Sequence, residues 1–113
     1  MHEMSLAENI VQLVEESAEA QGFSHARTIW LEIGALACVE VEALNFCFDI
    51  VAKGSKSENA QLEFSVVPGR GWCESCQGAV ELFDRVAVCP HCAGHQVKVT
   101  GGTEMRIKEL DVV

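Results

Sequence analysis

The chain has 113 residues, about half of them hydrophobic, which suits one small domain with a modest core and a small appendage. Its formal net charge is −9 and its eight Lys and Arg residues are scattered, which argues against binding to nucleic acid or to an anionic membrane surface. No signal peptide precedes the first helix pattern and no apolar stretch approaches the length of a membrane span, so we expect a cytoplasmic protein.

Hydrophobic periodicity predicts helix, strand, helix, strand, a cysteine-rich segment and a final strand. The expected helices cover 4–21 and 39–53, and the expected strands cover 28–34, 62–66 and 104–113. Ser5 and Glu8 fit a capping box at the start of the first helix. The predicted fold class is α+β: two helices packed on a three-stranded sheet, with a small inserted four-cysteine module that resembles a zinc ribbon. We expect an α/β domain formed by residues 1–69 and 97–113 and a zinc-binding module formed by residues 70–96.

The inserted segment carries two Cys-x2-Cys knuckles, Cys73/Cys76 and Cys89/Cys92, separated by twelve residues. Each knuckle can present two sulfur atoms to one ion from a tight turn, and four thiolates suit tetrahedral Zn²⁺. Four protein ligands leave no position for water or substrate, so we expect a structural zinc site. The segment contains few apolar residues, and zinc binding should therefore supply much of its folding free energy.

Other interpretations of the four cysteines remain open. A disulfide or redox pair suits the motif poorly in a reducing cytoplasm. Iron also accepts four thiolates, and it would indicate an electron-transfer protein. A zinc ribbon that binds nucleic acid conflicts with the acidic composition. Outside the knuckles, Cys47 lies on an apolar helical face, which indicates a buried small side chain.

The first three residues, Met1, His2 and Glu3, form a candidate chelating site. Histidine is too large at position two to permit methionine removal, so Met1 should keep a free terminal amine. That amine, the backbone nitrogen of His2 and the His2 imidazole can close adjacent chelate rings, and Glu3 adds a fourth donor through its backbone nitrogen or its carboxylate. Such donors suit Ni(II) or Cu(II). The alternative is a solvated terminus without a role.

The sequence resembles the HypA/HybF family of hydrogenase nickel-incorporation (maturation) proteins. The resemblance is carried by the MHEMSL start, the segment WLEIGA at 30–35, the segment FCFD at 46–49 and the paired knuckles, in that order. It implies Ni(II) binding at His2 and Glu3 with the amine of Met1, and zinc at the four knuckle cysteines. Some family members place a histidine after each knuckle, where this chain has Gln77 and Ala93.

The resemblance implies a nickel metallochaperone that delivers Ni(II) to the large subunit of [NiFe]-hydrogenase during maturation. Its implied partners are the maturation GTPase and that large subunit, and some members also serve urease maturation. We expect no enzyme activity, because no catalytic constellation or phosphate-binding loop is apparent and the zinc shell is full. The alternative is a zinc-ribbon adaptor for protein interactions that binds no specific nickel.

Overall fold

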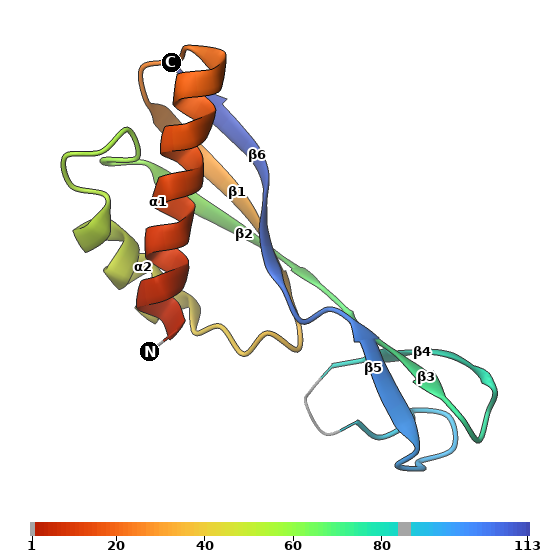
Figure 1. The fold of residues 1–113 in the computed structure, drawn as a ribbon. Helices are drawn as coiled ribbons and strands as arrows, with labels where there is room; N and C mark the ends of the chain where they lie inside the picture. Colours follow the sequence, from red (N-terminus) through yellow and green to blue (C-terminus); the bar gives the residue numbers. More distant parts are fainter. Residues whose placement is uncertain (1, 84–86) are drawn as a thin grey trace. The chain divides into compact units, whose positions relative to one another are not determined.

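The computed structural model describes residues 2–83 and 87–113. Two helices and six strands lie in these ranges (Figure 1). Their bounds are α1 His2–Gln21, β1 Ala26–Gly34, α2 Val41–Val51, β2 Gln61–Val67, β3 Gly69–Cys73, β4 Gly78–Leu82, β5 Val97–Gly101 and β6 Met105–Val112. The strands form two three-stranded sheets, with the orders β2-β1-β6 and β4-β3-β5. The predicted α+β class is confirmed.

The chain divides into two compact units. The first comprises Met1–Leu31, Val39–Phe64 and Ile107–Val113, and the second comprises Glu32–Cys38 and Ser65–Arg106. Each unit has its own buried cluster. The assignment of nickel and zinc to separate domains stays a prediction.

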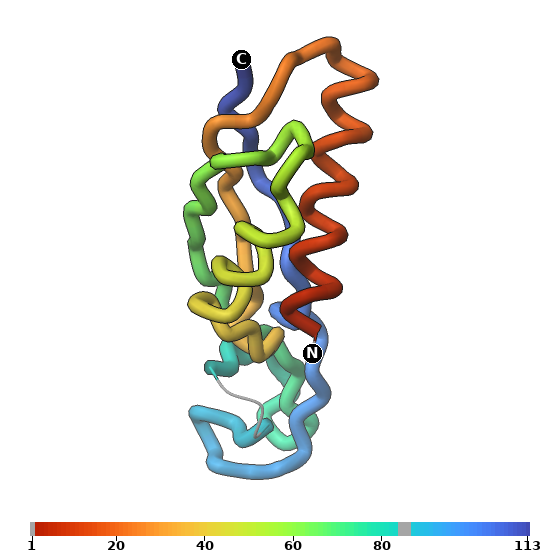
Figure 2. Tube along the Cα trace, turned by 90° about the vertical axis from the view of Figure 1, so that its left-hand side faces the viewer, coloured from red at the N-terminus to blue at the C-terminus, as the bar shows by residue number. Residues whose placement is uncertain are grey.

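The core of the first unit forms between the two helices and β1. Helix α1 buries one stripe at helical spacing, and it meets buried side chains of β1 and α2. These core residues are Ala7, Ile10, Val14, Ala18, Ile29, Leu31, Leu44 and Phe48. The two helices lie side by side in both views (Figures 1 and 2).

Helix α1 begins at His2, so the predicted capping box is wrong. Ser5 lies inside the helix, and the side chain that meets another element at this end is Glu3. Glu3 lies one turn before Ala7 on the stripe that faces the core. The core-facing stripe of α1 therefore has a carboxylate at its N-terminal end.

Carboxylates of α1 accept hydrogen bonds from the start of α2 and from the segment that follows α2. At its start, the backbone N–H of Glu40 donates to Oε2 of Glu3 at 3.1 Å. Just beyond its end, the backbone N–H of Lys56 donates to Oε2 of Glu15 at 2.6 Å. Glu40 is also the N-cap of α2, and its own side chain accepts from the backbone N–H of Glu42 at 3.3 Å. The start of α1 and the start of α2 are thus linked directly.

The second unit contains an antiparallel sheet in which β3 pairs with both β4 and β5. None of these three strands was predicted. The inward positions of β3 are Gly69, Gly71 and Cys73, so the strand lacks the alternating large apolar side chains that identify a strand in sequence. Leu36, which follows β1, joins Val80 and Leu82 in the core of this unit.

Candidate metal sites

The four knuckle cysteines converge in the second unit. Cys73 ends β3, Cys76 lies in the turn before β4, and Cys89 and Cys92 lie between β4 and β5. Their Sγ atoms all lie within 4.8 Å of one another. The pairs Cys73–Cys92 and Cys76–Cys89 are each separated by 3.8 Å. A tetrahedral shell with Zn–S distances of about 2.3 Å places sulfur atoms about 3.8 Å apart, so this donor set fits Zn²⁺.

In each knuckle a backbone N–H group points back at the sulfur atom of the first cysteine. The N–H of Cys76 points to Sγ of Cys73 at 3.4 Å, and the N–H of His91 points to Sγ of Cys89 at 3.4 Å. The residue after each knuckle has a left-handed backbone, with φ of 53° at Gln77 and 58° at Ala93. Backbone N–H groups directed at sulfur favour the thiolate form that a metal requires. Each turn therefore positions its two sulfur atoms and, through its backbone N–H groups, favours ionisation of the thiol that they face.

The thiols differ in their readiness to ionise without metal. The backbone N–H groups of Cys92 and His91 lower the pKa of Cys89 to about 6. Hydrogen bonds to the sulfur atoms of Cys92, Cys73 and Cys89 raise the pKa of Cys76 to about 12. Four thiols at this spacing cannot all become thiolates without a cation among them. Zn²⁺ would replace their protons and close the shell.

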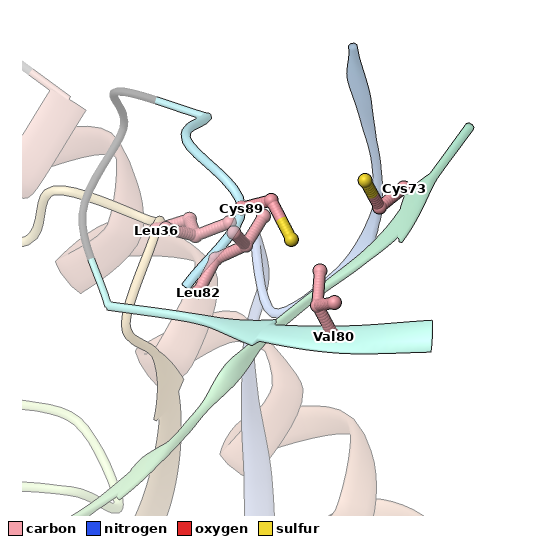
Figure 3. Packing of buried hydrophobic residues seen from close by; sticks show 5 residues of the cluster. All are labelled: Leu36, Cys73, Val80, Leu82 and Cys89. Carbon is pink, nitrogen blue, oxygen red and sulfur yellow. The ribbon is translucent and has the colours of Figure 1, made fainter. Parts of the chain in front are cut away.

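One side of the cysteine cluster is sealed by apolar side chains. Cys73 and Cys89 are buried, whereas Cys76 and Cys92 are exposed. The sulfur atoms of Cys73 and Cys89 point toward a common space, and Leu36 and Leu82 lie beside Cys89 (Figure 3). Leu36 was missed by sequence reasoning because it lies 37 residues before the first knuckle in the chain. No local pattern links it to the cysteines.

The second candidate site lies at the start of α1 in the first unit. The His2 side chain is 51% exposed and that of Glu3 is 17% exposed, with His2 Nε2 3.8 Å from Glu3 Oε2. The Glu40 N–H, which donates to the Glu3 carboxylate, holds the pKa of Glu3 below its ordinary value. Met1, the third predicted member, lies outside the described residues.

Glu40 is a neighbour of this site that sequence reasoning missed. In the sequence it falls within a helix predicted to start at residue 39, where nothing marks it as a contact of the first helix. Its N-cap position places its N–H against Glu3. An acidic residue before an apolar helical pattern is a weak signal for a helix N-cap, and it is the signal in the sequence that could have identified Glu40.

The remaining cysteines and histidines do not join the cysteine cluster. Cys38 is exposed, and Cys47, which its apolar helical face predicted to be a buried small side chain, is half-buried. His91, inside the second knuckle, and His95, just after it, are both exposed, and the set of four cysteines forms without them. Neither of the helices that the structure describes combines the length and apolar character needed to cross a membrane.

Known proteins match this chain over nearly its whole length. The model of the family described as "Hydrogenase/urease nickel incorporation, metallochaperone, hypA" matches residues 1–112. The hydrogenase maturation factor HypA of Azotobacter vinelandii is 54% identical over 112 residues, and that of Albidiferax ferrireducens is 50% identical over 112 residues. Both alignments cover 99% of this chain and 99% of the relative.

The fold is also similar to a solved structure. The solution structure of the Ni metallochaperone HypA from Helicobacter pylori superimposes with a TM-score of 0.75 at 23% sequence identity. The match covers 100% of this chain and 98% of the other. At this identity, the comparison supports the fold alone.

Proposed function

This chain belongs to the HypA family of hydrogenase and urease nickel-incorporation metallochaperones, and from that premise we propose that it carries Ni(II) at its N-terminus and delivers it to the large subunit of [NiFe]-hydrogenase. The proposed donors are the terminal amine of Met1, the backbone nitrogen and imidazole of His2, and Glu3. The protein acts by binding and release, without catalysis.

The observation that carries this proposal is the position of His2 and Glu3 in the first turn of α1. The first four N–H groups of a helix have no acceptor within the helix. Nickel can therefore replace the amide proton of His2 without breaking a hydrogen bond of α1. The positive end of the helix dipole also favours the deprotonated amide, although it opposes the approach of the free cation.

The cysteine cluster supports a different role for the second metal. Four sulfur donors at tetrahedral spacing suit Zn²⁺, whereas nitrogen and oxygen donors on an exposed terminus suit a flat Ni(II) complex. We propose that zinc, bound by Cys73, Cys76, Cys89 and Cys92, orders the second unit and is retained. Nickel, bound near the solvent, is the cargo. The two donor sets thus separate a resident ion from a transferred one.

The proposed partners follow from the family. A maturation GTPase would act with this protein in loading the hydrogenase large subunit, and urease maturation proteins are a second destination. We propose that this protein works in the cytoplasm. The acidic composition favours partner surfaces rich in Lys and Arg.

The test is nickel titration of untagged, zinc-loaded protein. We expect one nickel per chain in the parent and loss of that nickel in His2→Ala, with zinc content and circular dichroism unchanged. His25→Ala is the matched control, because His25 is also an exposed histidine of the first unit and should leave nickel binding intact.

The alternative function is a zinc-ribbon adaptor without a specific nickel site. It predicts one tight zinc per chain and equal, weak nickel uptake by the parent, His2→Ala and His25→Ala. Equal uptake by all three proteins would therefore remove the nickel proposal and leave the adaptor.

A further inference from the structure

Helix α2 has two apolar stripes rather than one. The first contains Leu44 and Phe48, which are buried in the core of the first unit. The second has the spacing i, i+3, i+4 and i+7, and its members are Ala43, Phe46, Cys47 and Ile50. Its two large side chains are exposed to solvent, that of Phe46 by 68% and that of Ile50 by 48%. The position of Cys47 on this second stripe explains why it is only half-buried.

An exposed apolar stripe is unusual on a surface helix. Such a helix ordinarily directs one apolar stripe to the core and polar side chains to solvent. Helix α1 follows this rule, and its exposed side carries Glu8, Gln12 and Glu19. Apolar side chains scattered singly over a surface are ordinary, but Phe46 and Ile50 lie one turn apart and form a continuous patch. A helix with apolar residues on two sides is suited to packing on two sides.

The charge that borders the second stripe is negative. Glu42 lies four residues before Phe46 and Asp49 lies three residues after it, so both exposed carboxylates are neighbours of the aromatic ring. Helix α1 contains five Glu residues and α2 contains one Glu and one Asp, whereas neither helix contains Lys or Arg. The first unit has twelve acidic and four basic residues, a net charge of −8, and the second has five acidic and four basic, a net charge of −1. The negative charge is thus concentrated in the unit that carries the stripe.

We propose that the second stripe of α2 docks a protein partner that presents an apolar groove with Lys and Arg side chains at its rim. Phe46 and Ile50 enter the groove, since residues at i and i+4 are the usual anchors when a helix packs into a groove. The basic rim faces Glu42 and Asp49. The stripe extends over about 10 Å of helix, so the groove holds two helical turns.

The same charges argue against two other occupants. A two-fold dimer formed through the stripe would bring the acidic border of one copy against the acidic border of the other. An anionic membrane surface would repel Glu42 and Asp49 in the same way. A basic protein surface is the occupant that satisfies both the apolar side chains and the carboxylates.

The first experiment measures binding of two purified probes by calorimetry, without nickel. The probes are the maturation GTPase and the hydrogenase large subunit, a choice that rests on the proposed function. We expect Phe46→Ala to weaken binding of at least one probe by roughly 30-fold, the usual effect of truncating a central aromatic anchor. Alanine has a higher helix propensity than phenylalanine, so α2 stays folded. Phe83→Ala is the matched control, because Phe83 is 71% exposed and lies in the second unit, and it should bind both probes as the parent does.

Three results of this experiment overturn the inference: equal losses in Phe46→Ala and Phe83→Ala, unchanged binding of both probes by Phe46→Ala, or no binding of either probe by the parent. Sedimentation of the protein alone tests the second copy as occupant. A dimer of the parent that Phe46→Ala dissociates would also overturn it. Failure of the parent to bind nickel would instead remove the proposed function and leave the docking result standing, so the two failures are distinguishable.

The second experiment tests the acidic border by reversing one charge. A lysine in place of Asp49 lies near the C-terminal end of α2, where the helix dipole favours a cation, so Asp49→Lys keeps the helix. We expect Asp49→Lys to weaken binding of the same probe roughly tenfold at low salt, with the difference from the parent shrinking as salt rises. Glu19→Lys, which changes the net charge equally at an exposed position of α1, should have a several-fold smaller effect. Equal effects of the two variants would show general charge attraction without a basic rim at the stripe, and would contradict the proposal.

Discussion

Ala93 is an unusual residue for its backbone conformation. Its φ of 58° is left-handed, and the side chain has no polar group to compensate. A left-handed conformation costs an L-residue roughly 1 to 2 kcal/mol. Its N–H donates to the carbonyl of Cys89 at 2.8 Å, so the second knuckle requires this conformation.

We expect Ala93→Gly to stabilise the zinc-loaded protein by about 0.5 kcal/mol, because the relief of strain exceeds the added entropy of the unfolded chain. Urea unfolding at fixed zinc concentration measures the change. Ala20→Gly, at an exposed position in α1, should instead destabilise by about 1 kcal/mol. A lower unfolding midpoint for Ala93→Gly than for the parent would show that the turn is not strained.

At the scale of residues, what could be predicted depended on the range of the interaction. The set of four cysteines followed from spacing, because each knuckle is a local turn, and the sulfur atoms do converge. Cys47 was expected to be a buried small side chain and is only half-buried, since periodicity defines a face but not what covers it. Leu36 and Glu40 could not be assigned, because tertiary contacts alone bring them to the two sites.

At the scale of elements, backbones approach closely around three glycines of the second unit. A Cβ at Gly34 would overlap the carbonyl of Gly102, and a Cβ at Gly102 would overlap the Cα of Gly69. The approach is stabilised by backbone hydrogen bonds, including Leu36 N to Gly102 O at 2.9 Å. Only glycine permits this contact, and Gly102 also has a φ of 81°.

Gly102→Ala should therefore lower the free energy of unfolding much more than a glycine-to-alanine substitution at another position of similar φ. Gly22 has a φ of 79°, and a Cβ added there would meet no atom within 4 Å, so Gly22→Ala carries the conformational cost alone, about 1 kcal/mol. Gly102→Ala adds a backbone clash, for a total of about 2 to 5 kcal/mol. Denaturant unfolding of both variants measures the difference, and equal losses would show that the backbones can separate without cost.

The long elements were predictable and the short ones were not. α1, β1, α2, β2 and β6 have apolar periodicity over seven or more residues, and all were expected with their ends misplaced by two residues or fewer. Strands β3, β4 and β5 each have five residues, and their inward positions include glycine and cysteine. These strands form because they pair with one another around a shared cluster of buried side chains. Hydrophobic patterning along the chain does not predict such pairing.

At the scale of the whole molecule, the two units are stabilised in different ways. The first unit has a core of aliphatic and aromatic side chains from both helices and β1. The core of the second unit includes Cys73 and Cys89, two of the four proposed zinc ligands, among few apolar residues. Apolar burial can hold the first unit without metal, whereas we expect the second to depend on the cross-link that an ion at the four sulfur atoms would provide.

Removal of zinc by a chelator should therefore disorder the second unit selectively. We expect amides of β3, β4 and β5 to lose hydrogen-exchange protection, while those of α1 and α2 keep most of theirs, because local stability follows each unit's own core. Cys73→Ser should reproduce the loss in zinc-containing buffer, and Cys38→Ser, which changes an exposed cysteine outside the cluster, should retain one zinc and full protection. If β3, β4 and β5 stay protected in the zinc-free protein, apolar packing around Leu36, Val80 and Leu82 is sufficient for their order, and zinc is not what holds this unit together.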